Sequence, residues 1–161
     1  MIQRWIENRR RRTTRLSAAA LQDWLTSIES VVAICSSSLR EKGIPSDIGV
    51  TLDRVDRELM RFRNHAAEVR RPLRQHSRAL ASRVAQTTDQ AFHLRNLTCA
   101  FLLRWQSVRQ TDPSADRALI ARREMEEARL QASESARALA AALESLAPEV
   151  RSTISLWVGT E

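Results

Sequence analysis

The arginines of this sequence are the residues whose type and spacing most directly indicate chemistry. Of the 26 basic residues only Lys42 is a lysine, and four arginines, Arg9–Arg12, follow one another with Arg15 close behind. Four consecutive helical residues point to every side of the helix, so this run cannot belong to one buried face. Its mutual repulsion favours an anionic partner. We therefore predict contacts with nucleic-acid phosphates at Arg9, Arg10, Arg11, Arg12 and Arg15.

Two other environments fit the same N-terminal run. An anionic membrane surface would attract the arginines, while Ile2, Trp5 and Ile6 would enter the interface as a small apolar face. Solvent alone would also accept the run as a basic tail. The sequence leaves these alternatives open. In each of them residues 1–15 form a basic N-terminal extension, and residues 16–161 form the domain that follows.

A second group of arginines occupies the middle of the chain. Residues 54–83 hold nine arginines but only three acidic residues, Asp56, Glu58 and Glu68, so partners within this segment are too few. Some arginines could cover the core with their aliphatic stems and pair with carboxylates of another helix. The others are available to phosphate, which the planar guanidinium recognises with paired hydrogen bonds. The predicted binding residues here are Arg63, Arg70, Arg71, Arg74 and Arg78.

One short segment resembles the motif of an enzyme family. The motif is an arginine, a spacer of four to six residues and a histidine, and Arg71-Pro72-Leu73-Arg74-Gln75-His76 fits it. It resembles the motif of HEPN ribonucleases, although the residue after the family's arginine is usually polar and is Pro72 here. The resemblance implies a helical bundle that dimerises to build an RNA-cleaving site from Arg71 and His76. The alternative is that His76, which falls on the apolar stripe, lies in the core or between helices.

The sequence lacks the usual motifs of metal and cofactor sites. It contains no CxxC pair, no HExxH and no glycine-rich phosphate loop, and its three histidines and two cysteines are scattered. We therefore predict no metal, no cofactor and no small-molecule substrate. Cys35 and Cys99 both stand among apolar residues, which is typical of reduced, buried thiols in a cytoplasmic protein. The most apolar stretch, residues 92–105, is shorter than the ~18 residues of a membrane-spanning helix.

The elements that must position these arginines are helices. Only three glycines are present, tyrosine is absent, and alanine, leucine, arginine and glutamate dominate, all of which favour helix. Apolar residues recur at spacings of three and four in three long tracts, roughly residues 21–39, 47–108 and 114–146. The near-heptad spacing predicts an all-α, elongated antiparallel helical bundle. Pro148 is expected to begin a short last helix that ends near Trp157.

The middle tract contains Pro72, which leaves two topologies open. An interior proline removes a hydrogen bond and kinks or breaks a helix. Its close flanks contain no Gly, Asn, Asp or Ser that would reverse the chain, and the apolar stripe continues through it in phase. We therefore favour three long helices with the middle one kinked at Pro72. The alternative is a bundle of four helices in which the chain folds back.

The charge distribution leads to a prediction of function. Residues 1–111 carry 20 basic and 10 acidic residues, a net charge of +10, whereas residues 112–161 carry 6 and 9, a net charge of −3. A basic region for a polyanion and a separate acidic region favour a protein that binds two kinds of partner. We predict a non-catalytic accessory or scaffold subunit that binds nucleic acid, either RNA or DNA. We further predict a protein partner or homo-oligomer, with Trp5 and Trp157 at that contact. The HEPN-like ribonuclease and attachment to an anionic membrane surface are the alternatives.

Overall fold

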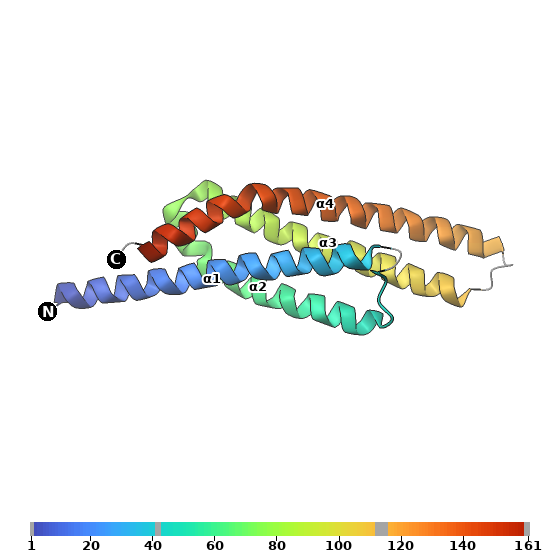
Figure 1. Cartoon of the computed structure of the whole chain (residues 1–161), viewed down its shortest axis with the longest axis horizontal. Helices are drawn as coiled ribbons and strands as arrows, with labels where there is room; N and C mark the ends of the chain where they lie inside the picture. The colour runs from blue at the N-terminus through green and yellow to red at the C-terminus, as the bar shows by residue number, and fades with distance from the viewer. Residues whose placement is uncertain (1, 41–42, 112–115, 160–161) are drawn as a thin grey trace.

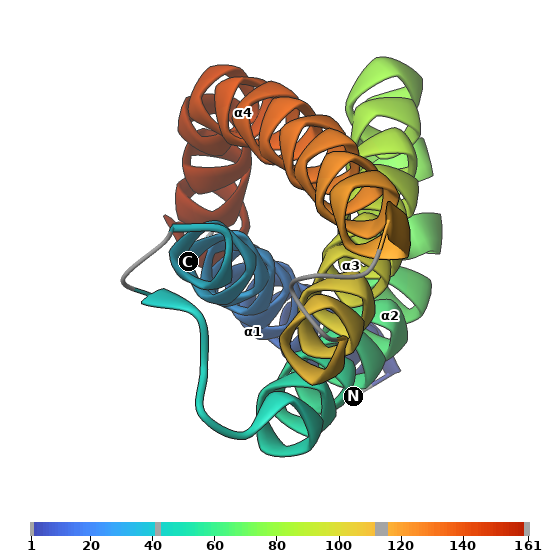
Figure 2. The same ribbon diagram turned by 90° about the vertical axis from the view of Figure 1, so that its right-hand side faces the viewer.

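The computed structural model describes residues 2–40, 43–111 and 116–159, without the side chains of residues 2, 4–11 and 116. It confirms the predicted all-α class. Four long helices form an antiparallel bundle, and they are α1 (Ile2–Ser38), α2 (Ile48–His76), α3 (Arg78–Gln110) and α4 (Asp116–Gly159). Neighbours along the chain pack on each other and α4 packs on α1, which closes the ring seen in Figure 2.

The chain reverses at Ser77, so the favoured topology with a kinked middle helix is wrong and the four-helix alternative holds. Ser77 is extended (φ −154°, ψ 117°), and its hydroxyl accepts a hydrogen bond of 3.2 Å from the backbone N–H of Leu80. Its own N–H donates to the carbonyl of Leu73 at 2.7 Å. This one residue therefore ends α2 and caps the start of α3. Pro72 lies inside α2, one turn before the reversal.

The core is formed by apolar residues that all four helices contribute at spacings of three and four. Its largest fully buried side chains include Trp24 of α1, Phe62 of α2 and Phe101 of α3. The buried stripe of α4 contains alanines, among them Ala132 and Ala136, which allow this helix to approach closely. Pro148 lies within α4 and begins no separate helix, because α4 continues unbroken to Gly159.

Both chain ends and the α2–α3 reversal lie at the same end of the elongated bundle, on the left in Figure 1. The other two connections lie at the opposite end. Helix α1 is continuous from residue 2 and extends past the reversal, so the basic N-terminal residues are the first turns of a bundle helix. Among the described side chains of α1, burial begins at Ser17. The N-terminal arginine run and the C-terminal half of α2 are thus brought to one end of the molecule.

Candidate nucleic-acid interface

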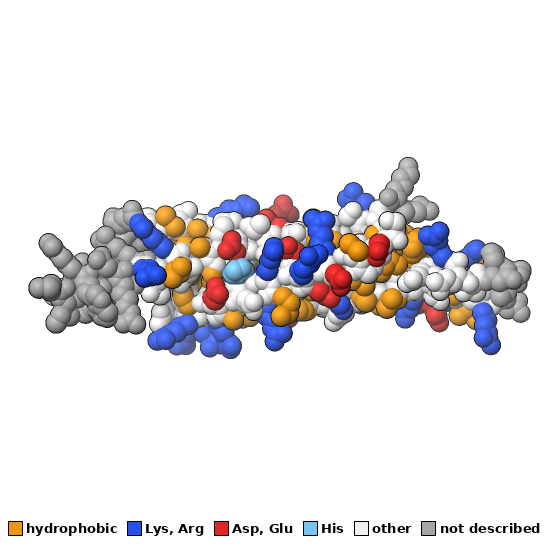
Figure 3. Space-filling model, turned by 90° about the horizontal axis from the view of Figure 1, so that it is seen from below, with side chains coloured by type: hydrophobic (Ala, Val, Ile, Leu, Met, Phe, Trp, Pro, Cys, Tyr) orange, Lys and Arg blue, Asp and Glu red, His pale blue; other side chains and the backbone are white. Residues whose placement is uncertain are grey.

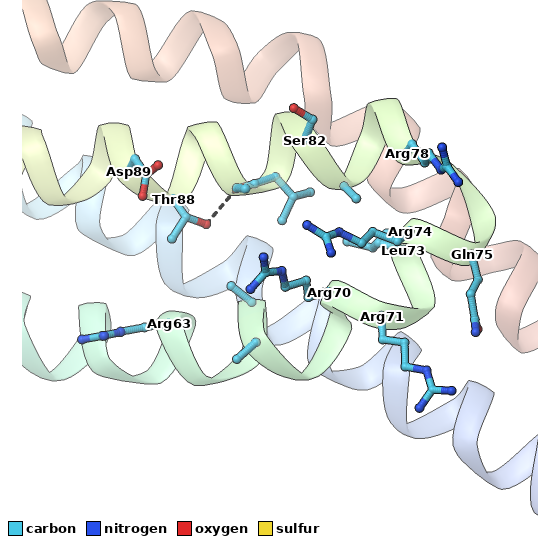
Figure 4. Close-up of a pocket in the computed structure, with 15 residues that line it drawn as sticks. Arg63, Arg70, Arg71, Leu73, Arg74, Gln75, Arg78, Ser82, Thr88 and Asp89 are labelled. Carbon is cyan, nitrogen blue, oxygen red and sulfur yellow. Dashed lines mark hydrogen bonds between the residues drawn. The ribbon is translucent and has the colours of Figure 1, made fainter.

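A groove lies between the C-terminal half of α2 and the N-terminal half of α3, next to the reversal at Ser77. Its volume is about 1340 Å³. We call it the arginine groove, and it is lined by Arg63, Ala66, Ala67, Arg70, Arg71, Leu73, Arg74 and Gln75 of α2 with Arg78, Ala81, Ser82, Val84, Ala85, Thr88 and Asp89 of α3. Figure 4 shows the two helices and the side chains between them.

All five arginines predicted from the middle of the sequence line this groove. Figure 4 shows Arg70 and Arg74 pointing from α2 into the space that faces α3. Arg71 and Arg78 point away from the centre and border the groove, and Arg63 lies at the end farther from the reversal. The site therefore has two inward guanidinium groups with three further cations around them.

The five groove arginines are unpaired within the described part of the chain. All five are exposed, and no ion pair or side-chain hydrogen bond joins any of them to another described residue. Among the described residues that line the groove, Asp89 is the one acidic side chain. A groove whose described lining carries five cations and one anion attracts a polyanion, because guanidinium groups without carboxylate partners keep their donors free.

Other arginines of the same helices do have carboxylate partners. Arg95 of α3 binds Asp56 of α2 through two hydrogen bonds of 2.8 Å. Arg83 bridges α3 to Glu149 of α4, and it also donates to Ser145 Oγ at 3.2 Å. Pairing with another helix, the alternative considered for the middle arginines, therefore occurs at Arg83, whereas the five groove arginines have no such contact.

Small apolar side chains form the floor of the groove. Ala66 and Ala67 of α2 and Ala81 and Ala85 of α3 are among the residues that line the groove, and Leu73 and Val84 of the same lining are buried in the core. We call the four alanines the alanine floor. Their methyl groups leave space between the two helices that larger side chains would fill. An arginine wall beside an apolar floor suits a ligand that is both anionic and partly apolar.

The N-terminal arginines lie on the helix that borders this end of the bundle. Arg12 and Arg15 are exposed, whereas the side chains of Arg9, Arg10 and Arg11 lie outside the described residues. Figure 3 shows several arginine side chains close to the same end, and arginine and acidic side chains alternate along the rest of this face. The two basic groups predicted separately from the sequence therefore occupy one end of the molecule.

Arg71 and His76 are not brought together within one chain. Five helical residues separate their side chains by about 140° around α2, because each residue turns the helix by about 100°. His76 is exposed, so its expected place in the core is wrong, whereas the alternative of a contact between helices is met by Trp157 of α4. It ends α2, and its ring meets the edge of Trp157 at a centroid distance of 6.0 Å. His76 does not line the groove.

Trp157, predicted at a partner contact, is partly buried and packs against the core of its own bundle. The side chain of Trp5, predicted at the same contact, lies outside the described residues. Several large apolar residues are well exposed, among them Leu16 of α1 at 64%. Leu119 and Ile120, near the start of α4, are 73% and 62% exposed and lie at the end opposite the groove.

Within the described residues, the cysteines and histidines form no cluster with acidic side chains. Among the described residues, no three His, Cys, Asp or Glu side chains gather as metal ligands would. Burial raises the pKa of the Cys35 thiol to about 11, and the nearby Arg95 lowers it less than burial raises it. Over the same residues, no helix is long and apolar enough to cross a membrane.

No protein-family model, curated protein or solved structure matches this chain. The feature that the sequence analysis missed is the alanine floor. The sequence contains the two alanine pairs, at residues 66–67 and at 81 and 85. They can be assigned to one groove only when the chain is known to reverse at Ser77.

Proposed function

We propose that this protein is a non-catalytic helical-bundle accessory or scaffold subunit that binds the phosphates of nucleic acid through the arginine groove. The observation that carries the proposal is the grouping of Arg63, Arg70, Arg71, Arg74 and Arg78 around one groove without ion pairs among the described residues. Arginine suits this role because its fork of donors matches two phosphate oxygens. Binding in such a groove releases counterions from the nucleic acid, which makes affinity depend strongly on salt.

The scaffold part of the proposal is supported by the opposite end of the bundle. Leu119 and Ile120 are adjacent, large and exposed, and such residues are frequent where a protein partner binds. A partner at that end would leave the arginine groove open to nucleic acid. The free Cys35 and Cys99 support a reducing compartment such as the cytoplasm.

The test is a salt titration of binding by fluorescence anisotropy. Full-length protein is titrated against labelled mixed-sequence RNA, single-stranded DNA and duplex DNA between about 50 and 200 mM salt. The variant that carries Arg70→Gln and Arg74→Gln should bind more weakly and lose about 1.4 units of slope on a single strand, since each phosphate contact contributes about 0.7.

The matched control changes Arg122 and Arg123 to glutamine. These two arginines are exposed near the start of α4, remote from the groove, and the change in net charge is the same. We expect the control to retain most of the affinity and slope of the parent protein. Equal losses in both variants would mean that net charge alone attracts nucleic acid, and the proposed site would be wrong.

A further inference from the structure

We infer that the arginine groove is a site for single-stranded nucleic acid, in which phosphates bind the arginines of α2 and unpaired bases lie on the alanine floor. This inference rests on the proposed function and adds the class of nucleic acid. It starts from the chemistry of the two parts of the groove. The wall carries guanidinium groups, and the floor carries the methyl groups of Ala66, Ala67, Ala81 and Ala85.

The floor distinguishes a single strand from a duplex. In a duplex the base faces are stacked inside and the phosphates lie on the outside of a wide rod, so a duplex would reach the bordering Arg71 and Arg78 but not the floor. A single strand exposes both phosphates and base faces. No aromatic side chain is among the described residues of the groove, so bases would meet methyl groups and the planes of guanidinium groups, on which bases also stack.

The dimensions of the groove favour a segment of polymer over a small metabolite. Its volume of about 1340 Å³ exceeds the range of about 300–1,000 Å³ that is usual for small-molecule sites. Arg70 and Arg74, the two inward arginines, stand one helical turn apart, a rise of about 6 Å along α2. Arg63 and Arg78 extend the row of cations toward both ends of the groove. A short stretch of chain with repeated charges is the ligand that uses all of them.

The experiment compares three DNA probes of equal length, about 16 nucleotides, with the full-length protein. They are an oligothymidine, the same strand paired with its complement, and an abasic strand that keeps the phosphates but lacks the bases. Affinities are measured over a range of salt and extrapolated to 1 M, where counterion release no longer contributes. We expect oligothymidine to bind about tenfold more tightly than either of the other probes at the high-salt limit.

A floor variant supplies the second measurement. Ala85 is exposed within the groove, and Ala85→Leu should fill the floor without disturbing the core. It should remove most of the advantage of oligothymidine over the abasic strand and leave the salt slope unchanged. Ala138→Leu, at an exposed position of α4 outside the groove, makes the same change in size and serves as the control. Thermal melts followed by circular dichroism verify that both variants fold.

The outcomes separate this inference from the proposed function. If the variant with Arg70→Gln and Arg74→Gln binds every probe as the parent does, the groove does not bind nucleic acid and both proposals are wrong. If those arginines matter but the three probes bind equally at 1 M salt, the phosphate site stands and the single-strand inference is overturned. Displacement of oligothymidine by polyglutamate at equal charge concentration would also overturn it, because a polyanion without bases would then suffice.

Discussion

The indole N–H of Trp24 on α1 donates a hydrogen bond of 3.2 Å to the hydroxyl of Thr88 on α3. Trp24 is completely buried, whereas Thr88 is half-buried and lines the arginine groove. The hydroxyl of Thr88 in turn donates to the carbonyl of Val84 at 2.7 Å. Thr88 therefore joins the α3 side of the groove to the buried Trp24 of α1, which fixes the position of that side.

Thr88→Val should destabilise the bundle by leaving the indole N–H of Trp24 buried without an acceptor. A buried donor that loses its partner costs about 1–3 kcal/mol. The neighbouring Thr87 is the matched control, because its hydroxyl also donates to a carbonyl four residues earlier at 2.7 Å but accepts nothing from Trp24. Urea unfolding should show a larger loss for Thr88→Val than for Thr87→Val. Equal losses would show that the hydrogen bond from Trp24 contributes nothing to stability.

The sequence was sufficient to predict the helices but not the reversal between α2 and α3. The buried stripe runs through Val69 and Leu73 to Leu80 and Val84, and a single non-helical residue hardly shifts its phase. The stripe therefore looks the same for a continuous helix and for two antiparallel ones. Pro72 draws attention as the strongest helix breaker, yet the break occurs where Ser77 can cap the following helix.

The arginines of the site were predicted from the sequence, but the groove was not. An excess of arginine over acidic residues is a property of composition, so the sequence alone shows it. The alanine floor depends on which residues of α3 face which residues of α2, and that pairing follows from the reversal at Ser77. The expected place of His76 in the core was wrong for a related reason. It continues the apolar stripe, but it is the last residue of α2 and its side chain is exposed.

Ser77→Ala should weaken the reversal. The variant loses the acceptor for the backbone N–H of Leu80, and an N-cap of this kind contributes about 1 kcal/mol. Ser77→Asn keeps a capping oxygen and should restore most of the stability. Unfolding in urea measures both variants, and X-ray scattering shows whether the four-helix shape is kept. If the two substitutions prove equally stable, the cap does not hold this reversal.

The protein should lose stability at alkaline pH because of Cys35. Burial raises the pKa of this thiol from 9.0 to about 11, so the folded state keeps a proton that the unfolded state has lost. The free energy of unfolding is therefore unaffected by ionisation of this thiol below pH 9, and it falls as the pH rises from 9 toward about 11. Few other groups titrate in this range, because the sequence has no tyrosine and a single lysine.

Cys35→Ala isolates this effect. The substitution leaves a cavity and lowers stability at pH 8 or below by about 1 kcal/mol. The gap between parent and variant should then narrow as pH rises from 9 to about 11, because only the parent protein has the buried thiol. Denaturant unfolding at a series of pH values measures the gap. A gap that stays constant would show that the thiol ionises as readily in the folded protein as in the unfolded chain.

Replacing Arg9 through Arg12 with glutamine should weaken nucleic-acid binding and reduce its salt dependence. These residues belong to α1, which extends past the end of the bundle where the arginine groove lies. If all four contact phosphates, the slope on a single strand should fall by about 2.8 units.

The matched control replaces four exposed arginines elsewhere, Arg104, Arg117, Arg122 and Arg123, with the same change in net charge. On long strands the loss of affinity should exceed that of the control, because the N-terminal run and the groove share one end of the molecule and one strand can contact both. On strands too short to reach both, the loss of affinity should be smaller. An unchanged slope with an intact fold would mean that Arg9–Arg12 are a solvated tail, and the binding surface would then be confined to the groove.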